Sequence, residues 1–359
     1  MTAFALEREH RRPALHDRRT LLFVALAALV VLAGLLGLSL GATGVPLSRV
    51  LAVIGDALTG HVATGSDALI ILQVRLPRLL LALLIGAALA SSGALMQGLF
   101  RNPLADPGLI GVSAGAALAA AATIVLGDRL LAPFIGSLPF AALPVGAFAG
   151  GLVTMLGLYL VSTRSGRTSI ATMLLAGVAF AALAGAGMGL FSYLSDDRQL
   201  RDLTFWTLGS LSGATWTKVF AVTPFVLPTL LAMPFLARGL NALSLGEAEA
   251  FHLGVPVQHV KAAAILLVAV AVGASVAASG MIGFVGIVVP HMLRLMAGAN
   301  HKMLLPASAL LGATLLVAAD TVARTIVAPA ELPIGILTAA IGAPFFLWLL
   351  LRRQGGMVL

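Results

Sequence analysis

Long apolar runs recur along the whole chain, separated by short stretches rich in charged residues, Gly and Pro. A helix needs about 20 apolar residues to cross a membrane. Ten runs approach or exceed that length, at residues 21–40, 76–100, 108–126, 139–162, 169–194, 217–236, 259–279, 282–298, 304–323 and 334–351. The pattern therefore predicts an all-α polytopic membrane protein of about ten transmembrane helices. They form one domain over residues 21–353, between a basic N-terminal segment (1–20) and a C-terminal tail (354–359).

The stretches between the runs carry predictions of their own. Residues 41–72 are expected to form a polar, turn-rich connection. Residues 101–107 contain two prolines, which should break the helix that precedes them. Residues 195–216 alternate charged, small and aromatic residues, so we expect a short external helix or re-entrant piece there instead of a full span.

An even number of crossings places both termini on the same side of the membrane. Cytoplasmic loops are enriched in Lys and Arg, and most of the 22 Lys and Arg residues fall in segments that share a side with the N-terminus. These residues are Arg8, Arg11, Arg12, Arg18, Arg19, Arg101, Arg164, Arg167, Arg238, Lys261, Arg294, Lys302, Arg352 and Arg353. We therefore expect both termini and the loop 237–258 to be cytoplasmic.

Composition excludes several classes of function. With 60% hydrophobic and 10% charged residues, the chain is not an ordinary soluble domain. Its net charge of +8 does not indicate nucleic-acid binding, because the basic residues are scattered at the ends of the apolar runs. The chain has no Cys, no P-loop motif and no His spacing typical of a metal site. We therefore expect that the chain is not an enzyme and binds no cofactor. Any ATP must then be bound by a partner.

The polar loop 237–258 has an ordered pattern. Ser244 followed by Glu247 is a capping-box signature and predicts a short helix that begins there, which Gly254 and Pro256 should end. Three apolar residues at a spacing of three should share one face of that helix: Leu245, Ala248 and Phe251. The pattern fits two structures equally, a helix that docks in the groove of a partner and a surface helix at the membrane boundary.

Three arginines are expected at the outer ends of spans, where positive residues are under-represented: Arg75, Arg78 and Arg324. They suit either the binding of carboxylates on a partner or substrate, or the anchoring of lipid phosphates. Asp320 is four residues before Arg324, a spacing that favours an ion pair between them. Gln97 suits a hydrogen bond between helices, and the pair Gly185 and Gly189 suits close helix packing.

Several segments together resemble a known family. They are Arg75-Leu-Pro-Arg78, residues 86–97, residues 102–113, residues 279–291, Ala319-Asp320, residues 331–335 and residues 342–345. From about residue 70 to the C-terminus, the chain resembles the FecCD/vitamin B12-type permeases of bacterial ABC importers.

The resemblance implies a ten-helix subunit with type II ABC importer architecture in the bacterial inner membrane. It implies three kinds of protein partner: a second copy of the chain, two cytoplasmic ATPase subunits that bind ATP and Mg, and a periplasmic binding protein. By the resemblance, the loop 237–258 couples the permease to the ATPase through Ser244, Gly246, Glu247, Ala250, Phe251, His252 and Gly254. The binding protein is expected to dock on Arg75, Arg78 and Arg324, and the translocation pathway to pass Gln97, Gly185 and Gly189.

The segment Leu203–Trp216 is most similar to haem permeases, so haem import is the expected function. Two alternatives stay open at this point. The chain is a siderophore or vitamin B12 permease of the same family, or it is an ion-coupled secondary transporter that uses Asp320, His291 or Arg294.

Overall fold

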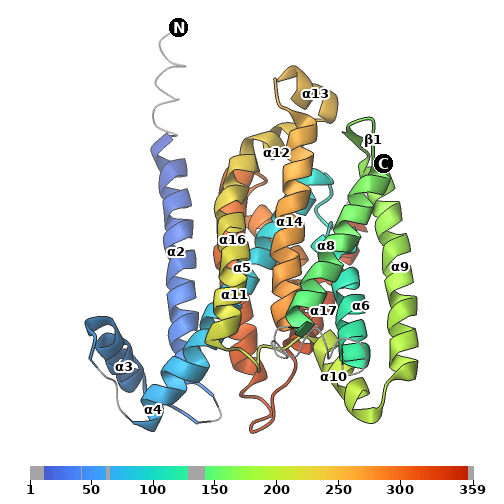
Figure 1. The fold of residues 1–359 in the computed structure, drawn as a ribbon. Helices are drawn as coiled ribbons and strands as arrows, with labels where there is room; N and C mark the ends of the chain where they lie inside the picture. The colour runs from blue at the N-terminus through green and yellow to red at the C-terminus, as the bar shows by residue number, and fades with distance from the viewer. Residues whose placement is uncertain (1–11, 42, 62–64, 128–141, 355–359) are drawn as a thin grey trace.

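The computed structural model describes residues 12–41, 43–61, 65–127 and 142–354. In these ranges the long helices stand side by side as a bundle (Figure 1). Seven helices are long and apolar enough to cross a membrane. Three shorter apolar helices occupy the other positions at which the sequence predicts spans, Val112–Leu126, Val285–Ala297 and Ile334–Trp348. The described residues confirm the all-α architecture with about ten spans.

The long elements follow one another along the chain as α2 (Arg12–Ser39), α5 (Leu76–Leu99), α6 (Val112–Leu126), α8 (Ala142–Ser162), α9 (Ile170–Leu194), α11 (Trp216–Ala232), α14 (Val257–Ser279), α15 (Val285–Ala297), α16 (His301–Ala323) and α17 (Ile334–Gln354). Short elements connect them: α3 (Leu47–Thr59), α4 (Ser66–Leu69), the π-helix η1 (Ile70–Arg75), the 3-10 helices η2 (Pro107–Ile110) and η4 (Met233–Leu236), α10 (Asp197–Leu208), α12 (Ala237–Leu243) and α13 (Glu247–His252). The strands β1 (Thr163–Arg164) and β2 (Arg167–Thr168) pair antiparallel, with Thr163 opposite Thr168.

Helix α5 forms the centre of the bundle and packs against α16, α15, α14 and α11. Its close approach to two neighbours depends on glycine. A Cβ on Gly86 would collide with the backbone of Gly312 in α16, and a Cβ on Gly93 would collide with the backbone of Gly286 in α15. The absence of these side chains lets the backbones touch, as in other membrane bundles.

Helix α9 is the opposite case. Only 17% of its most apolar window is buried within the protomer, against 78% for the helix that contains α5. Exposed apolar residues are stable in lipid or against another protein. The outer face of α9 therefore faces one of these two environments.

Two predictions about residues 41–76 are wrong. The connection contains the helix α3, whose Val50 and Val53 are buried in a small core with Ile71. Helical structure also starts before residue 76, at Ser66, and passes through η1 into α5. Pro77 does not interrupt it and lies just after the π-helical turn η1, where the hydrogen-bond pattern of the helix changes.

Two other predictions are confirmed. Helix α5 ends at Leu99, and an irregular stretch follows up to η2, as the two prolines require. Residues 195–216 contain a short helix instead of a full span, α10, which begins with a capping box between Asp196 and Gln199. Helix α10 is amphipathic and buries Leu203, so it lies along the end of the bundle and does not cross it.

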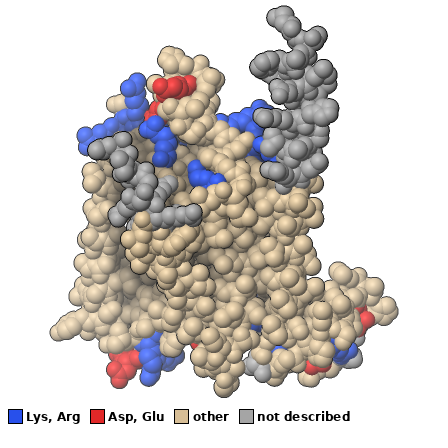
Figure 2. All heavy atoms as spheres, turned by 180° about the vertical axis from the view of Figure 1, so that it is seen from behind, with Lys and Arg blue, Asp and Glu red and all other residues tan. Residues whose placement is uncertain are grey.

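The bundle has two polar ends. Helix α2 begins and α17 ends at the end that carries α13 and the β1–β2 hairpin, whereas α3 and α10 lie at the opposite end (Figure 1). Figure 2 shows Lys, Arg, Asp and Glu gathered toward these two ends on the face it draws, with a broad uncharged band between them. This distribution is that of a membrane-spanning protein.

Candidate functional sites

The first candidate site is α13, which stands out from one end of the bundle (Figure 1). It begins at Glu247, after Gly246 with a φ of 134°. The predicted capping box is wrong, since the Ser244 hydroxyl donates to the Asn241 carbonyl at 2.6 Å and the Glu247 carboxylate lies 2.6 Å from Lys261 Nζ. Gly246 occupies the N-cap position instead, and its φ lies in a region that favours glycine.

The end of this helix agrees with the sequence, and its predicted apolar face agrees only in part. Helix α13 ends at His252, before Gly254 with its φ of 78°. Of the three residues predicted to share a face, Ala248 and Phe251 lie on the helix, whereas Leu245 precedes it; all three are exposed. Phe251 is 71% exposed and its ring contacts that of His252 at 6.1 Å between centroids. Ala250 is fully buried on the opposite side.

Three large apolar side chains therefore lie exposed on α13 and at its two ends and are called its apolar cluster: Phe251, and Leu245 and Leu253, each 65% exposed. This cluster lies beyond the uncharged band, among charged residues, so lipid tails do not cover it. Contiguous apolar residues that are exposed among polar ones mark an interaction site. The geometry favours docking of α13 against a partner over an inert surface helix.

The second candidate site is an ionic cluster at the opposite end. Arg78 donates to Asp320 from Nε at 3.0 Å and from Nη2 at 2.8 Å, and to Glu331 from Nη1 at 2.8 Å. The side chains of Arg78 and Asp320 are 8% and 5% exposed, whereas that of Glu331 is 37% exposed. The cluster thus joins α5, α16 and the segment before α17 by a buried bidentate ion pair and a half-exposed one.

Arg75 and Arg324 complete the cluster on its α2 side. Arg75 donates to the carbonyls of Leu38 at 2.6 Å, Ser39 at 2.9 Å and Thr43, and Arg324 donates to the carbonyl of Gly37. Both arginines therefore satisfy carbonyl groups at the end of α2, which have no partner within that helix.

The structure brings the three predicted arginines together but buries them. Arg75, Arg78 and Arg324 are 5%, 6% and 9% exposed. The predicted pair of Asp320 with Arg324 is looser, at 3.9 Å, than the bidentate pair of Asp320 with Arg78. Their docking role stays a prediction, and it must now include Glu331.

A family model for the FecCD transport family matches residues 29–352. The chain belongs to this family. Among curated FecCD relatives, the hemin transport system permease protein HmuU of Yersinia pestis is 51% identical over 287 residues, 79% of this chain and 83% of that protein. The cobalamin import system permease protein BtuC of Halobacterium salinarum is 44% identical over 281 residues, 78% of this chain and 73% of that protein.

The match extends over nearly the whole chain in other FecCD proteins. The vitamin B12 import system permease protein BtuC of Shigella boydii is 42% identical over 331 residues, 92% of this chain and 95% of that protein. A solved inward-facing structure of a metal-chelate type ABC transporter superposes with a TM-score of 0.79 at 35% identity, covering 93% of this chain and 99% of that chain. The protein is therefore a permease subunit of an ABC importer and not itself an enzyme.

The three pathway candidates of this FecCD permease lie in different surroundings. Gln97 is 1% exposed and bridges α5 to α15, donating to the Ile287 carbonyl and accepting from Arg294, both at 3.4 Å. Gly185 and Gly189 lie on the exposed side of α9, with open space where a Cβ would be. Gln97 therefore connects two helices within the protomer, and the two glycines face its exterior.

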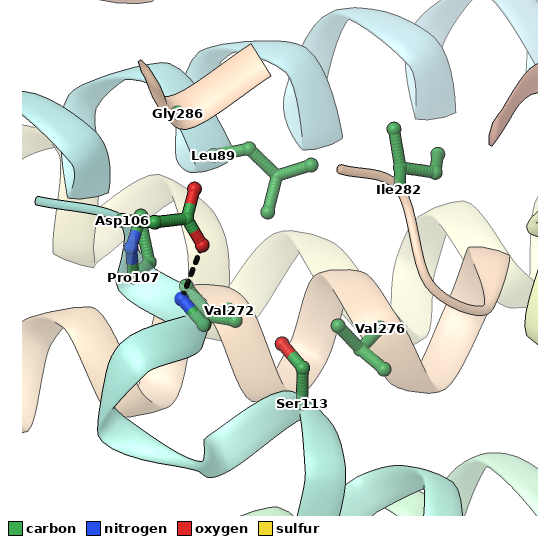
Figure 3. Close-up of a pocket in the computed structure, with 9 residues that line it drawn as sticks. Leu89, Asp106, Pro107, Ser113, Val272, Val276, Ile282 and Gly286 are labelled. Atoms are coloured by element: carbon green, nitrogen blue, oxygen red, sulfur yellow. Dashed lines mark hydrogen bonds between the residues drawn. The ribbon is translucent and has the colours of Figure 1, made fainter. Parts of the chain in front are cut away.

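A small pocket lies between α5, η2, α6, α14 and the start of α15 (Figure 3). Asp106 accepts a hydrogen bond from the Gly108 N–H at 2.7 Å, and Ser113 points into the same space from α6. Its volume of about 30 Å³ holds one water molecule, whereas sites for drug-sized ligands have roughly 300 Å³ or more. The cargo of this permease does not fit there. Within the described ranges, no group of three His, Asp or Glu side chains is placed to hold a metal ion.

Sequence reasoning missed three polar contacts in this FecCD permease. Lys261 is buried beneath α13, although it looked like an ordinary basic residue at a span end. Glu331 belongs to the segment 331–335, which carries part of the family resemblance, but its partner Arg78 is 253 residues away. Asn241 accepts from the His301 N–H at 2.9 Å and ties α12 to α16, with no signal in the sequence.

Proposed function

We propose that the chain imports haem from the periplasm to the cytoplasm, as one of two copies in an ATP-driven importer. The observation that carries the proposal is the exposed apolar cluster on α13, since an importer permease needs a surface through which a separate ATPase acts on it. The relative HmuU supports haem as the cargo. The BtuC relatives support a corrinoid as the second candidate.

The ATPase partner binds α13. Leu245, Phe251 and Leu253 form the apolar contact, and the exposed His252 and Gly254 lie beside them. Short helices with such faces bind in grooves of partner proteins. ATP and Mg belong to the two ATPase subunits, one for each permease copy.

The α13 end is cytoplasmic. The basic residues Arg164, Arg167, Arg238 and Lys302 lie in the segments at that end, together with the beginning of α2. The positive-inside rule then places α2 with its N-terminal end in the cytoplasm and α17 with its C-terminal end there too.

A second copy of the chain covers part of the exposed surface of the bundle, and lipid covers the rest. The cargo passes between the two copies, and the pocket beside Asp106 is too small to hold it. Gly185 and Gly189 support α9 as a helix that faces this pathway, because their bare backbone leaves room there.

The periplasmic binding protein docks over the ionic cluster. Arg75 donates to backbone carbonyls, whereas Arg78 also holds a half-exposed carboxylate that a carboxylate from outside can replace. Its bond to the half-exposed Glu331 is the one that a docking carboxylate can replace, since the bonds to Asp320 are buried. Docking is then an exchange of one carboxylate for another at Arg78.

Two measurements test this function. Replacing Phe251 by Asp should abolish co-purification of the ATPase with the permease, while the exposed Leu58, which lies at the opposite end, provides a matched control in L58D. Retention of the ATPase by F251D would refute the role of α13. For the cargo, the assembled importer with its binding protein should accumulate hemin in proteoliposomes and not cobalamin. The reverse preference would establish the corrinoid alternative.

A further inference from the structure

Lys261 is an unusual residue in the first turns of α14. Its side chain is only 2% exposed, and it heads the largest fully buried side chains of the described protein. A buried ammonium group is costly unless anions or carbonyls surround it. Lys261 Nζ lies 2.6 Å from Glu247 Oε1 of α13 and donates to the carbonyl of Thr168 at 3.0 Å. One nitrogen therefore binds both α13 and β2.

Gln258 strengthens the second of these contacts. It precedes Lys261 by three residues, so both side chains lie on the same face of α14. Gln258 Oε1 accepts the Thr168 N–H at 3.0 Å, while Lys261 binds the Thr168 carbonyl. Both backbone polar groups of Thr168 are thus held by α14 side chains. Thr168 Oγ1 is also 3.0 Å from Thr163 Oγ1, which joins it to β1.

Thr168 is directly connected to α9. The next residue, Ser169, is the N-cap of that helix and accepts the Thr172 N–H at 3.2 Å. A displacement of Thr168 therefore moves the first turn of α9. Helix α13 packs on α12 and α14, and β2 packs on α14, so α14 lies between the two elements that Lys261 joins.

We infer that Lys261 is a positioning residue that transmits the movement of α13 to the start of α9, with Glu247 on one side and Thr168 on the other. The inference rests on the proposed role of α13 as the ATPase contact. Glu247 is 41% exposed and is part of α13, so it moves together with that helix when the ATPase moves it. Lys261 passes that movement to Thr168, and α9 carries it along the largely exposed face on which Gly185 and Gly189 lie.

The test uses the complete importer in proteoliposomes, with permease, ATPase and binding protein. The readout is the stimulation of ATP hydrolysis by binding protein loaded with hemin or cobalamin, whichever stimulates the wild-type complex. K261M keeps the apolar stem and removes both contacts, so it should lower the stimulation about fivefold or more. ATPase co-purification should not change. Lys302 is an exposed lysine at the same end, and K302M should leave the stimulation unchanged.

A second variant keeps the inference falsifiable if K261M does not fold. Q258L breaks only the bond to the Thr168 N–H and should lower the stimulation in the same direction by a smaller factor. If F251D loses the stimulation of ATP hydrolysis, the role of α13 holds. Wild-type stimulation in Q258L, or in a folded K261M, would then overturn the inference about Lys261. Wild-type stimulation in F251D would instead refute the proposed role of α13.

Discussion

Replacing Asp320 by Asn is expected to destabilise the protein strongly, because Asp320 holds the centre of a buried ionic cluster. Its two carboxylate oxygens accept from Arg78 at 3.0 Å, 3.0 Å and 2.8 Å, and Arg324 Nε lies 3.9 Å away. Both members of the Arg78–Asp320 pair are less than a tenth exposed, at 8% and 5%. Without the carboxylate, two guanidinium groups lose their buried counter-charge.

Removing one partner of a buried ion pair costs about 3–5 kcal/mol. Asn keeps one acceptor oxygen and nearly the same shape, so we expect D320N to lose about 3 kcal/mol, the lower end of that range. The matched variant is E331Q, in the same cluster but with a side chain 37% exposed. It should cost at most about 1 kcal/mol, because exposed ion pairs contribute little.

The assay is equilibrium unfolding of the purified permease in detergent micelles, compared among the wild type, D320N, E331Q and the double variant R78M/D320L. The double variant removes both charges of the closest pair and should regain part of the loss, because Arg324 alone then remains buried without its counter-charge. Equal losses in D320N and E331Q would refute the assignment of Asp320 as the buried centre of the cluster.

Three further predictions concern packing, docking and orientation. G93A should destabilise the protein by about 1–3 kcal/mol in the same unfolding assay, since its Cβ would meet the Gly286 backbone. The control G55A has open space at that position and should not destabilise it. Equal stability of both variants would contradict the close contact of α5 and α15. E331Q should tighten docking of the binding protein, measured by surface binding, and R78A should weaken it, more strongly at low salt. Unchanged affinity in both would leave the ion pairs within the protomer as the role of Arg78. The chain has no native Cys, so a membrane-impermeant thiol reagent should label A248C only from the cytoplasm and D197C only from the periplasm, and the opposite result would invert the topology.

The sequence predicted features that depend on local periodicity. The spans follow from apolar runs, and the exposed face of Ala248 and Phe251 on α13 follows from their spacing. The amphipathic α3 carries the same kind of signal, since Val50, Val53 and Ile54 recur at helical spacing, but the polar residues around it hid the pattern.

Contacts between distant segments were beyond sequence reasoning. The Ser244–Glu247 spacing fits a capping box, yet Glu247 is bound by Lys261, whose position beneath α13 depends on how α14 packs. The arginines look like exposed docking residues because of their place at span ends. Their burial follows from Asp320, 242 residues from Arg78, and from the carbonyls at the end of α2. Neither contact has a periodic signal.

The central claim is that this permease moves its cargo only with a separate ATPase that acts through α13. Hemin uptake into proteoliposomes measures this most directly, with the permease reconstituted alone or together with its ATPase and binding protein. The complete importer should accumulate hemin when ATP is supplied, and the F251D importer and the permease alone should not, even with a proton gradient. Uptake by the permease alone under a proton gradient would contradict the account and establish an ion-coupled transporter.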